Sequence, residues 1–88
     1  MTATSLDAAS VLSVVRAELA VAAPDVPADA PADADLKYDL AVDSLSILEL
    51  VARLEYHYSV TVPDEDWAQL NSLNAIVDYV IAAHGSPT

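Results

Sequence analysis

The chain is short, rich in alanine and strongly acidic. Its 88 residues are enough for one small domain and no more. Hydrophobic residues make up 55% of it, but 17 residues are Ala, so the core must come from a modest set of Val, Leu, Ile, Tyr and Trp. A net charge of -11 should repel nucleic acid and anionic membrane surfaces and attract a partner with a basic docking surface. An acidic surface that only keeps a small domain soluble would give the same balance.

Two further features of the composition limit the function. The chain has no cysteine, which excludes a disulfide framework and a thiolate metal site. No run of residues approaches the roughly 18 apolar positions of a membrane span, and none resembles a signal peptide. The sequence therefore predicts a cytoplasmic protein with no membrane partner and no nucleic-acid partner.

The first predicted element is a helix that begins at Asp7, after a disordered lead-in at residues 1–6. Its apolar residues recur at helical spacing and define one face, with Arg16 and Glu18 off that face. The face comprises Ala8, Val11, Leu12, Val15, Leu19 and Ala22. Pro24 ends the helix, because proline cannot continue it.

Residues 23–35 predict a long loop, because prolines and aspartates alternate with alanines. The aspartates are Asp25, Asp29, Asp33 and Asp35. Leu36 and Leu40 should anchor the end of the loop in the core, while Lys37 and Tyr38 should be exposed. Clustered carboxylates can bind calcium. However, the loop has no Gly for a sharp turn and no closing Glu, so the sequence favours loose screening by cations over a metal site.

The most informative stretch is Asp43-Ser44-Leu45 and the helix that it begins. Asp43 and Ser44 both have short oxygen side chains, and either could cap a helix that continues to about Tyr58. The core-facing side of this helix comprises Ile47, Leu50, Val51, Leu54 and Tyr58.

The opposite side of this helix is apolar as well, although a solvated face should be mostly charged. It comprises Leu45, Ala52 and Tyr56, with Leu48 at its margin, interleaved with Glu49. This pattern predicts a helix that packs on one side and meets partners on the other. Ser44 places a hydroxyl at the helix N-terminus, where backbone N–H groups favour a phosphate.

A short helix is predicted after an extended link over residues 59–63, in which Val60 and Val62 point inward. Three acids follow Pro63 and suit the first turn of this helix, which covers Trp67 and Leu70. We interpret Trp67 as a core or rim residue rather than a ligand-facing aromatic.

The last predicted helix follows a cap at Asn71-Ser72 and ends at Gly85 and Pro87. Its buried face comprises Leu73, Ile76, Val77 and Val80. No segment alternates with period two over the length of a strand. The sequence therefore predicts one all-α domain over residues 1–88, ordered from about 7 to 84. It is a four-helix bundle of three main helices and one short helix, with a long first loop.

A catalytic Ser44 would need an adjacent base. His57 lies 13 residues further along the same helix, which at about 1.5 Å per residue is roughly 20 Å away. Spacing alone does not exclude His84, but no Gly-x-Ser-x-Gly elbow or Gly-rich phosphate loop accompanies it. We interpret both histidines as surface groups and Asp43 as a helix cap, so no enzyme is predicted.

Several of these motifs together resemble the acyl carrier proteins of fatty acid and polyketide synthesis. They are Asp43-Ser44-Leu45, Glu49-Leu50-Val51, Leu54-Glu55 and Val62-Pro63-Asp64-Glu65-Asp66. The resemblance extends from about Leu12 to Val80. In that family the Ser of the Asp-Ser-Leu motif carries 4′-phosphopantetheine, so the resemblance implies that Ser44 is the attachment residue. It also implies the helical arrangement with a long first loop.

The resemblance implies a monomeric carrier that does no chemistry itself. A phosphopantetheinyl transferase would attach the arm from coenzyme A. An acyl-loading enzyme, either an acyltransferase or a ligase, would charge the thiol of the arm, and a ketosynthase or other acyl-consuming enzyme would use the thioester. The residues expected to contact partners are Asp43, Leu45, Glu49, Ala52, Glu55 and Tyr56. Glu49 and Glu55 would meet basic residues, and Leu45 an apolar pocket.

Three positions depart from the family pattern. Ala41 stands where the family usually has Gly, so the turn before Ser44 must adopt a conformation that alanine tolerates. Ala52 replaces a bulkier apolar residue, and Tyr56 stands where fatty acid carriers usually have an acid. The last two favour a carrier of polyketide or other secondary-metabolite biosynthesis over a housekeeping fatty acid carrier.

Two alternatives stay open at the level of sequence. One is a discrete aminoacyl or aryl carrier of a nonribosomal peptide or hybrid pathway, although its usual Gly-Gly-x-Ser signature is absent. The other is an acidic helical adaptor, in which Ser44 is only a cap and the helix docks a basic partner. The intact mass after incubation with coenzyme A and a broad-specificity transferase distinguishes a carrier from an adaptor.

Overall fold

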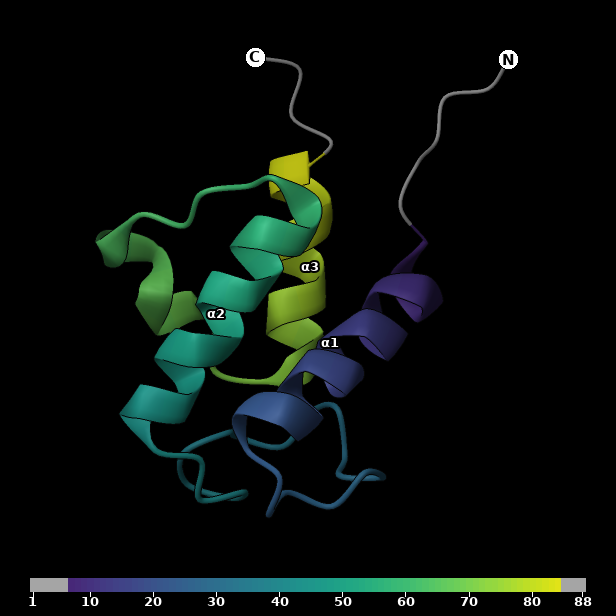
Figure 1. Cartoon of the computed structure of the whole chain (residues 1–88), viewed down its shortest axis with the longest axis vertical. Coiled ribbons are helices and arrows are strands. Elements are labelled where there is room, and N and C mark those ends of the chain that lie inside the picture. The colour runs from purple at the N-terminus through teal and green to yellow at the C-terminus, as the bar shows by residue number, and fades with distance from the viewer. Residues whose placement is uncertain (1–6, 85–88) are drawn as a thin grey trace.

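The computed structural model describes residues 7–84. This part of the chain contains four helices, joined by loops, and no strand. The helices are α1 (Ala8–Ala22), α2 (Ser44–Tyr58), the short 3-10 helix η1 (Asp64–Gln69) and α3 (Leu73–His84). In Figure 1, α2 and α3 lie between α1 on the right and η1 on the left. This arrangement confirms the all-α prediction of three main helices and one short helix.

A single hydrophobic core joins the three α-helices, and α1 packs against both α2 and α3. The largest fully buried side chains are Val11, Val15, Leu36, Leu50, Val51, Leu73 and Ile76. The predicted core faces of α2 and α3 are confirmed, except that Tyr58 is only half-buried. On α1 the prediction was wrong for Ala8, which is exposed in the first turn, where α1 diverges from the other helices.

The loop between α1 and α2 has no regular structure. Hydrogen bonds hold it to α1 and to the residues just before α3. The Arg16 guanidinium donates hydrogen bonds to the carbonyls of Ala28 (3.2 Å) and Ala30 (2.9 Å). Leu36 is fully buried, and its backbone N–H donates to the carbonyl of Asn71 at 2.9 Å. Leu36 therefore anchors the end of the loop as predicted.

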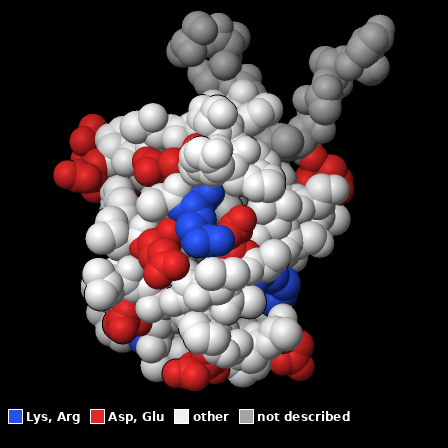
Figure 2. All heavy atoms as spheres, viewed as in Figure 1, with Lys and Arg blue, Asp and Glu red and all other residues white. Residues whose placement is uncertain are grey.

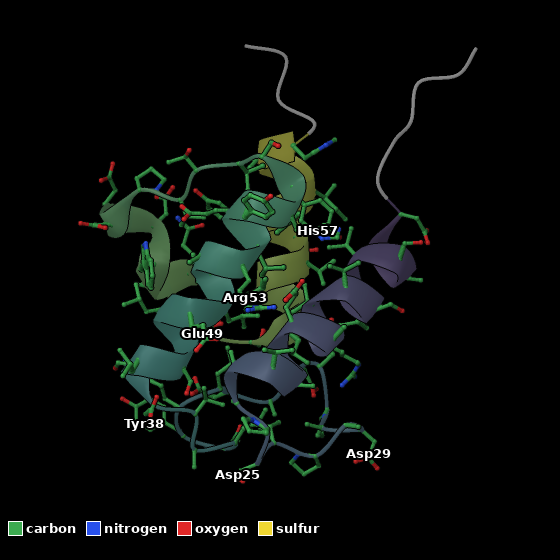
Figure 3. All side chains as sticks on the ribbon, viewed as in Figure 1. Asp25, Asp29, Tyr38, Glu49, Arg53 and His57 are labelled. Atoms are coloured by element: carbon green, nitrogen blue, oxygen red, sulfur yellow. The ribbon has the colours of Figure 1, made fainter. Side chains whose placement is uncertain are left out.

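The loop aspartates point outward rather than toward a common centre. Asp25, Asp29 and Asp33 are exposed, and Figure 3 shows the first two at the outer edge of the loop. Asp35 instead stabilises a turn, because its carboxylate accepts hydrogen bonds from the backbone N–H groups of Lys37 (2.9 Å) and Tyr38 (2.8 Å). Among residues 7–84, no group of three acidic or His side chains lies close enough to hold a metal ion.

The segment between α2 and α3 packs its apolar residues against the core. Trp67 is half-buried, and its indole N–H donates to the Val62 carbonyl at 3.3 Å, which confirms its interpretation as a rim residue. The Ser72 hydroxyl accepts a hydrogen bond from Ala75 N–H at 3.1 Å and caps α3. The predicted lead-in and the predicted helix end at Gly85 and Pro87 lie outside the described residues. No helix within residues 7–84 is long and apolar enough to cross a membrane.

Candidate functional site

The N-terminus of α2 is capped by Asp43, which leaves Ser44 as the first residue of the helix. The Asp43 carboxylate accepts a hydrogen bond from Ser46 N–H at 2.7 Å. Hydrogen bonds from the backbone and hydroxyl of Ser46, with one from the backbone of Leu45, hold the pKa of Asp43 below its ordinary value. Ser44 itself is exposed. Of the two caps that the sequence allowed, the structure has Asp43.

The turn that leads into α2 requires a left-handed residue. Ala41 has a φ of 57°, a region that costs an L-residue with a Cβ about 1–2 kcal/mol. Alanine therefore adopts this conformation at a cost that glycine would not have. The turn forms because Val42 is buried and its N–H donates to the carbonyl of Leu36 at 2.8 Å. This bond fixes the chain just before Asp43.

The side of α2 that faces away from the core carries large apolar side chains, as the sequence predicted. Leu45 is 74% exposed, Leu48 49% and Tyr56 90%, and Ala52 between them is also exposed. These residues begin directly after Ser44 and continue toward the far end of the helix. Surface patches of this kind are typical of sites that bind other proteins.

The two glutamates expected to meet partners differ in what surrounds them. Glu55 is half-buried, and its carboxylate accepts a hydrogen bond from Val62 N–H at 2.8 Å, which ties α2 to the segment that follows it. Glu49 is exposed and lies 3.8 Å from the guanidinium of Arg53. Arg53 also pairs with Glu18 of α1, with 2.5 Å between Nε and Oε1. Figure 3 shows Arg53 between α2 and α1.

Sequence reasoning missed Arg53 as a member of this surface. Its spacing of four residues from Glu49 is the usual signal for an ion pair on a helix and could have revealed that contact. Glu18 is 35 residues away in sequence, so nothing in the local pattern indicated the pair that joins α1 to α2.

Both histidines lie at the end of the bundle opposite Ser44. The rings of His57 and Tyr58 lie 4.6 Å apart, and those of Tyr58 and His84 lie 6.2 Å apart. Because Tyr58 is the last residue of α2 and Ser44 the first, the helix separates them by roughly 20 Å. Neither imidazole can therefore activate Ser44. Burial raises the pKa of Tyr58.

A small apolar cavity lies between α2, α3 and the segment that joins them. Its lining comprises Val51, Leu54, Glu55, Val60, Val62, Leu70, Ile76, Tyr79 and Val80. The Tyr79 hydroxyl donates to the Asp66 carboxylate at 2.6 Å and so joins α3 to η1. This hydrogen bond, with smaller contributions from burial and neighbouring acids, raises the pKa of Tyr79 to about 12.

Comparison with known proteins places this arrangement in a family. The family model described as "Phosphopantetheine attachment site" matches residues 9–80. An acyl carrier protein from Enterococcus faecalis has a similar structure, with a TM-score of 0.72 and 29% identity, over 89% of this chain and 99% of that one. The chain therefore belongs to the phosphopantetheine attachment-site family and, within it, to the acyl carrier proteins.

Relatives known by sequence match parts of the chain. An acyl carrier protein of Rhodococcus erythropolis is 48% identical over 42 residues, which is 48% of this chain and 46% of the relative. One from Chlorobium phaeobacteroides is 37% identical over 43 residues, or 49% of this chain and 55% of the relative. A non-reducing polyketide synthase of Preussia isomera is 30% identical over 61 residues, or 69% of this chain but 2% of the synthase. The chain thus spans about half the length of the carrier relatives.

Membership of this family defines the cofactor. The phosphopantetheine attachment domain is the part of acyl carrier proteins to which 4′-phosphopantetheine is covalently bound.

Proposed function

We propose that Ser44 carries the 4′-phosphopantetheine arm and that the thiol of the arm carries an acyl group as a thioester. The observation that supports this most directly is the exposure of Ser44 at the first position of α2, with Asp43 serving as the cap in its place. The Ser44 hydroxyl is therefore not needed for the helix and is accessible to an enzyme.

The chemistry of attachment suits this position. The Ser44 oxygen attacks the pantetheine-bearing phosphorus of coenzyme A, the bond from that phosphorus to the bridging oxygen breaks, and 3′,5′-ADP leaves. The transferase accepts the serine proton. The product is a phosphodiester at a helix N-terminus, where outward-pointing N–H groups stabilise negative charge. This local effect offsets part of the repulsion expected in a chain with a net charge of -11.

The expected partners are a phosphopantetheinyl transferase, an acyl-loading enzyme and an enzyme that consumes the acyl group, such as a ketosynthase. All of them must approach the end of α2 that bears Ser44. Asp43, Leu45, Glu49, Ala52 and Tyr56 are exposed around or beyond Ser44 and are available for contact. Glu55 is held by Val62 N–H, so a role in binding would compete with its role in the fold.

We propose polyketide or other secondary-metabolite biosynthesis as the pathway. Ala52 and Tyr56 lie on the exposed side of α2, where fatty acid carriers usually have a bulkier apolar residue and an acid. The similarity to a polyketide synthase over 69% of the chain is consistent with this pathway. Housekeeping fatty acid synthesis and an aminoacyl or aryl pathway are the alternatives. The cytoplasmic location stays a prediction.

Intact-mass measurement tests the attachment residue. Incubation with coenzyme A and a broad-specificity transferase should add the mass of one arm to the wild-type protein and nothing to Ser44→Ala. The variant should remain folded, because Asp43 keeps the cap. A mass gain in Ser44→Ala would show that another residue is modified. No gain in the wild type would favour the adaptor. The intact mass of protein from its native host would then identify the acyl group.

A further inference from the structure

Basic side chains are scarce in this chain, and two of its three Lys and Arg residues are already engaged. The Arg16 guanidinium donates hydrogen bonds to two carbonyls of the loop between α1 and α2. Arg53 pairs with Glu18, and Figure 2 shows basic atoms at the centre of one face with acidic atoms on both sides. Lys37 is exposed, and its ammonium group has no ion-pair or hydrogen-bond partner within residues 7–84. It is therefore free to bind an anion.

The acids that are close to Lys37 in sequence bind backbone N–H groups instead of its ammonium group. The Asp35 carboxylate accepts hydrogen bonds from the backbone N–H of Lys37 itself (2.9 Å) and from the next N–H along the chain (2.8 Å). The Asp39 carboxylate accepts the Asp35 N–H at 2.8 Å, and the Asp43 carboxylate caps α2. Each of these carboxylates thus has a backbone partner, which leaves the Lys37 side chain available.

The turn that carries Lys37 is fastened close to Ser44. The Leu36 carbonyl accepts a hydrogen bond from Val42 N–H at 2.8 Å, so the chain folds back just before α2 begins. Starting from this bond, standard backbone dimensions limit the separation of the Lys37 and Ser44 Cα atoms to at most about 15 Å. Figure 3 shows Tyr38, the next residue, at the same end of the molecule as the start of α2. A lysine side chain, with its four-carbon stem, and a phosphate on the Ser44 oxygen can together span this separation.

We propose that the ammonium group of Lys37 binds the phosphodiester of the 4′-phosphopantetheine arm and holds the base of the arm beside the turn that precedes α2. The contact rests on the proposed function, because it requires the arm to be attached at Ser44. Attachment places a new negative charge next to Asp43 in a chain whose net charge is already -11, and Lys37 is the cation of residues 7–84 that has no other partner. Hydrogen bonds between a lysine and a phosphate are charge-assisted and stronger than neutral ones. Lys37 is therefore a residue that positions the arm.

Urea denaturation before and after attachment of the arm tests this contact, because the contact exists only in the modified protein. Attachment should lower the urea midpoint by about 0.5 M more in Lys37→Gln than in the wild type, which at about 1 kcal/mol per M is the roughly 0.5 kcal/mol of an exposed ion pair. This difference should shrink in 1 M sodium chloride, where screening is strong. Lys37→Arg should respond to attachment as the wild type does, because a guanidinium also binds phosphate. Lys37 is exposed, so the unmodified variants should keep the wild-type fold.

The matched control makes the same change in net charge on another element. Ala17→Glu, at an exposed position of α1, lowers the net charge by one, as Lys37→Gln does, and should respond to attachment as the wild type does. The phosphorus of the arm gives a second readout, since its NMR resonance should move in modified Lys37→Gln and stay in place in modified Ala17→Glu. An unmoved resonance in Lys37→Gln would overturn the proposal. So would equal midpoint changes in the wild type and Lys37→Gln, or an equal extra loss in Ala17→Glu.

The same measurements separate the ion pair from the attachment residue that it requires. If the wild-type protein gains no arm at all, the failure lies in the assignment of Ser44. If the wild type is modified but neither its urea midpoint nor its phosphorus resonance depends on Lys37, only the ion pair is refuted and the attachment residue stands.

Discussion

The two sides of α2 are both apolar, but only one of them packs against the rest of the chain. The core side, with Leu50 and Leu54, packs against the other helices of its own chain and is almost completely buried. The outer side, with Leu45 and Tyr56, remains exposed and borders Ser44. Helical spacing predicts both rows equally well, so only the packing of the neighbouring elements shows which row forms the core. The comparison teaches that apolar character on its own does not distinguish a face that packs in the core from one that stays exposed.

The largest effect that would test this difference comes from matched truncations on the two sides. Leu50→Ala removes a fully buried side chain and should lower the free energy of unfolding by about 2–5 kcal/mol. Leu45→Ala, at a position that is 74% exposed, should change it by no more than about 0.5 kcal/mol. Denaturation by urea, followed by circular dichroism, measures both. Equal losses would mean that the outer row also supports the fold.

The second test concerns the hydrogen bond that joins α3 to η1. Tyr79→Phe removes the hydroxyl that donates to Asp66 and should lower the free energy of unfolding by about 1–2 kcal/mol at neutral pH. The pKa of Tyr79 is raised from 10.0 to about 12 in the folded protein, so its contribution should persist below pH 10 and disappear as the pH rises toward 12.

A pair of unfolding series isolates this contribution. The difference in stability between the wild type and Tyr79→Phe, measured by urea denaturation from pH 7 to 11.5, should narrow above pH 10. Ionisation of the other tyrosines, including Tyr58, changes the stability of both proteins equally and so drops out of this difference. A difference in stability that stayed constant across this range would show that the contribution of Tyr79 does not depend on its hydroxyl proton.

The third test concerns the charges at the edge of the outer side. Arg53→Gln breaks the pair with Glu18 and the weaker contact with Glu49, and it should lower stability by about 0.5–1 kcal/mol. Because Glu18 is closer to Arg53 and less exposed than Glu49, Glu18→Gln should cost more than Glu49→Gln. Urea denaturation at low and high salt measures these differences, which should shrink as salt rises. Equal losses for the two glutamate variants would contradict the predominance of the Glu18 pair.

Most of the fold could be predicted from the sequence, because it depends on local signals. The spacing of Leu73, Ile76, Val77 and Val80 predicted the buried face of α3, and Pro24 marked the end of α1. Asp43 and Ser72 were recognised as helix caps from their short oxygen side chains. Each of these signals lies within a few residues of the structure that it determines.

Other features of the site could not be predicted, because they depend on contacts distant in sequence or on backbone groups. The bond from Val62 N–H to Glu55 involves a backbone donor, which no pattern of side chains reveals. The Arg53–Glu18 pair requires the packing angle of α1 on α2. The left-handed Ala41 follows from the burial of Leu36 and Val42 on either side of the turn, so the tertiary structure overrides the local preference of alanine.

The smallest expected effect lies at this turn, which sets the start of α2. Ala41→Gly should raise the free energy of unfolding by about 0.5–1 kcal/mol, because glycine adopts a φ of 57° without the Cβ clash, and this gain exceeds the extra entropy of glycine in the unfolded chain. Ala28→Gly, at an exposed loop position not among the positive-φ residues of the described chain, has only the entropic cost and should be neutral or destabilising. Urea denaturation of both variants against the wild type measures the difference. If Ala41→Gly destabilised the protein as much as Ala28→Gly, Ala41 would not be strained in the folded protein. The placement of Asp43 and Ser44 would then involve no strained residue before them.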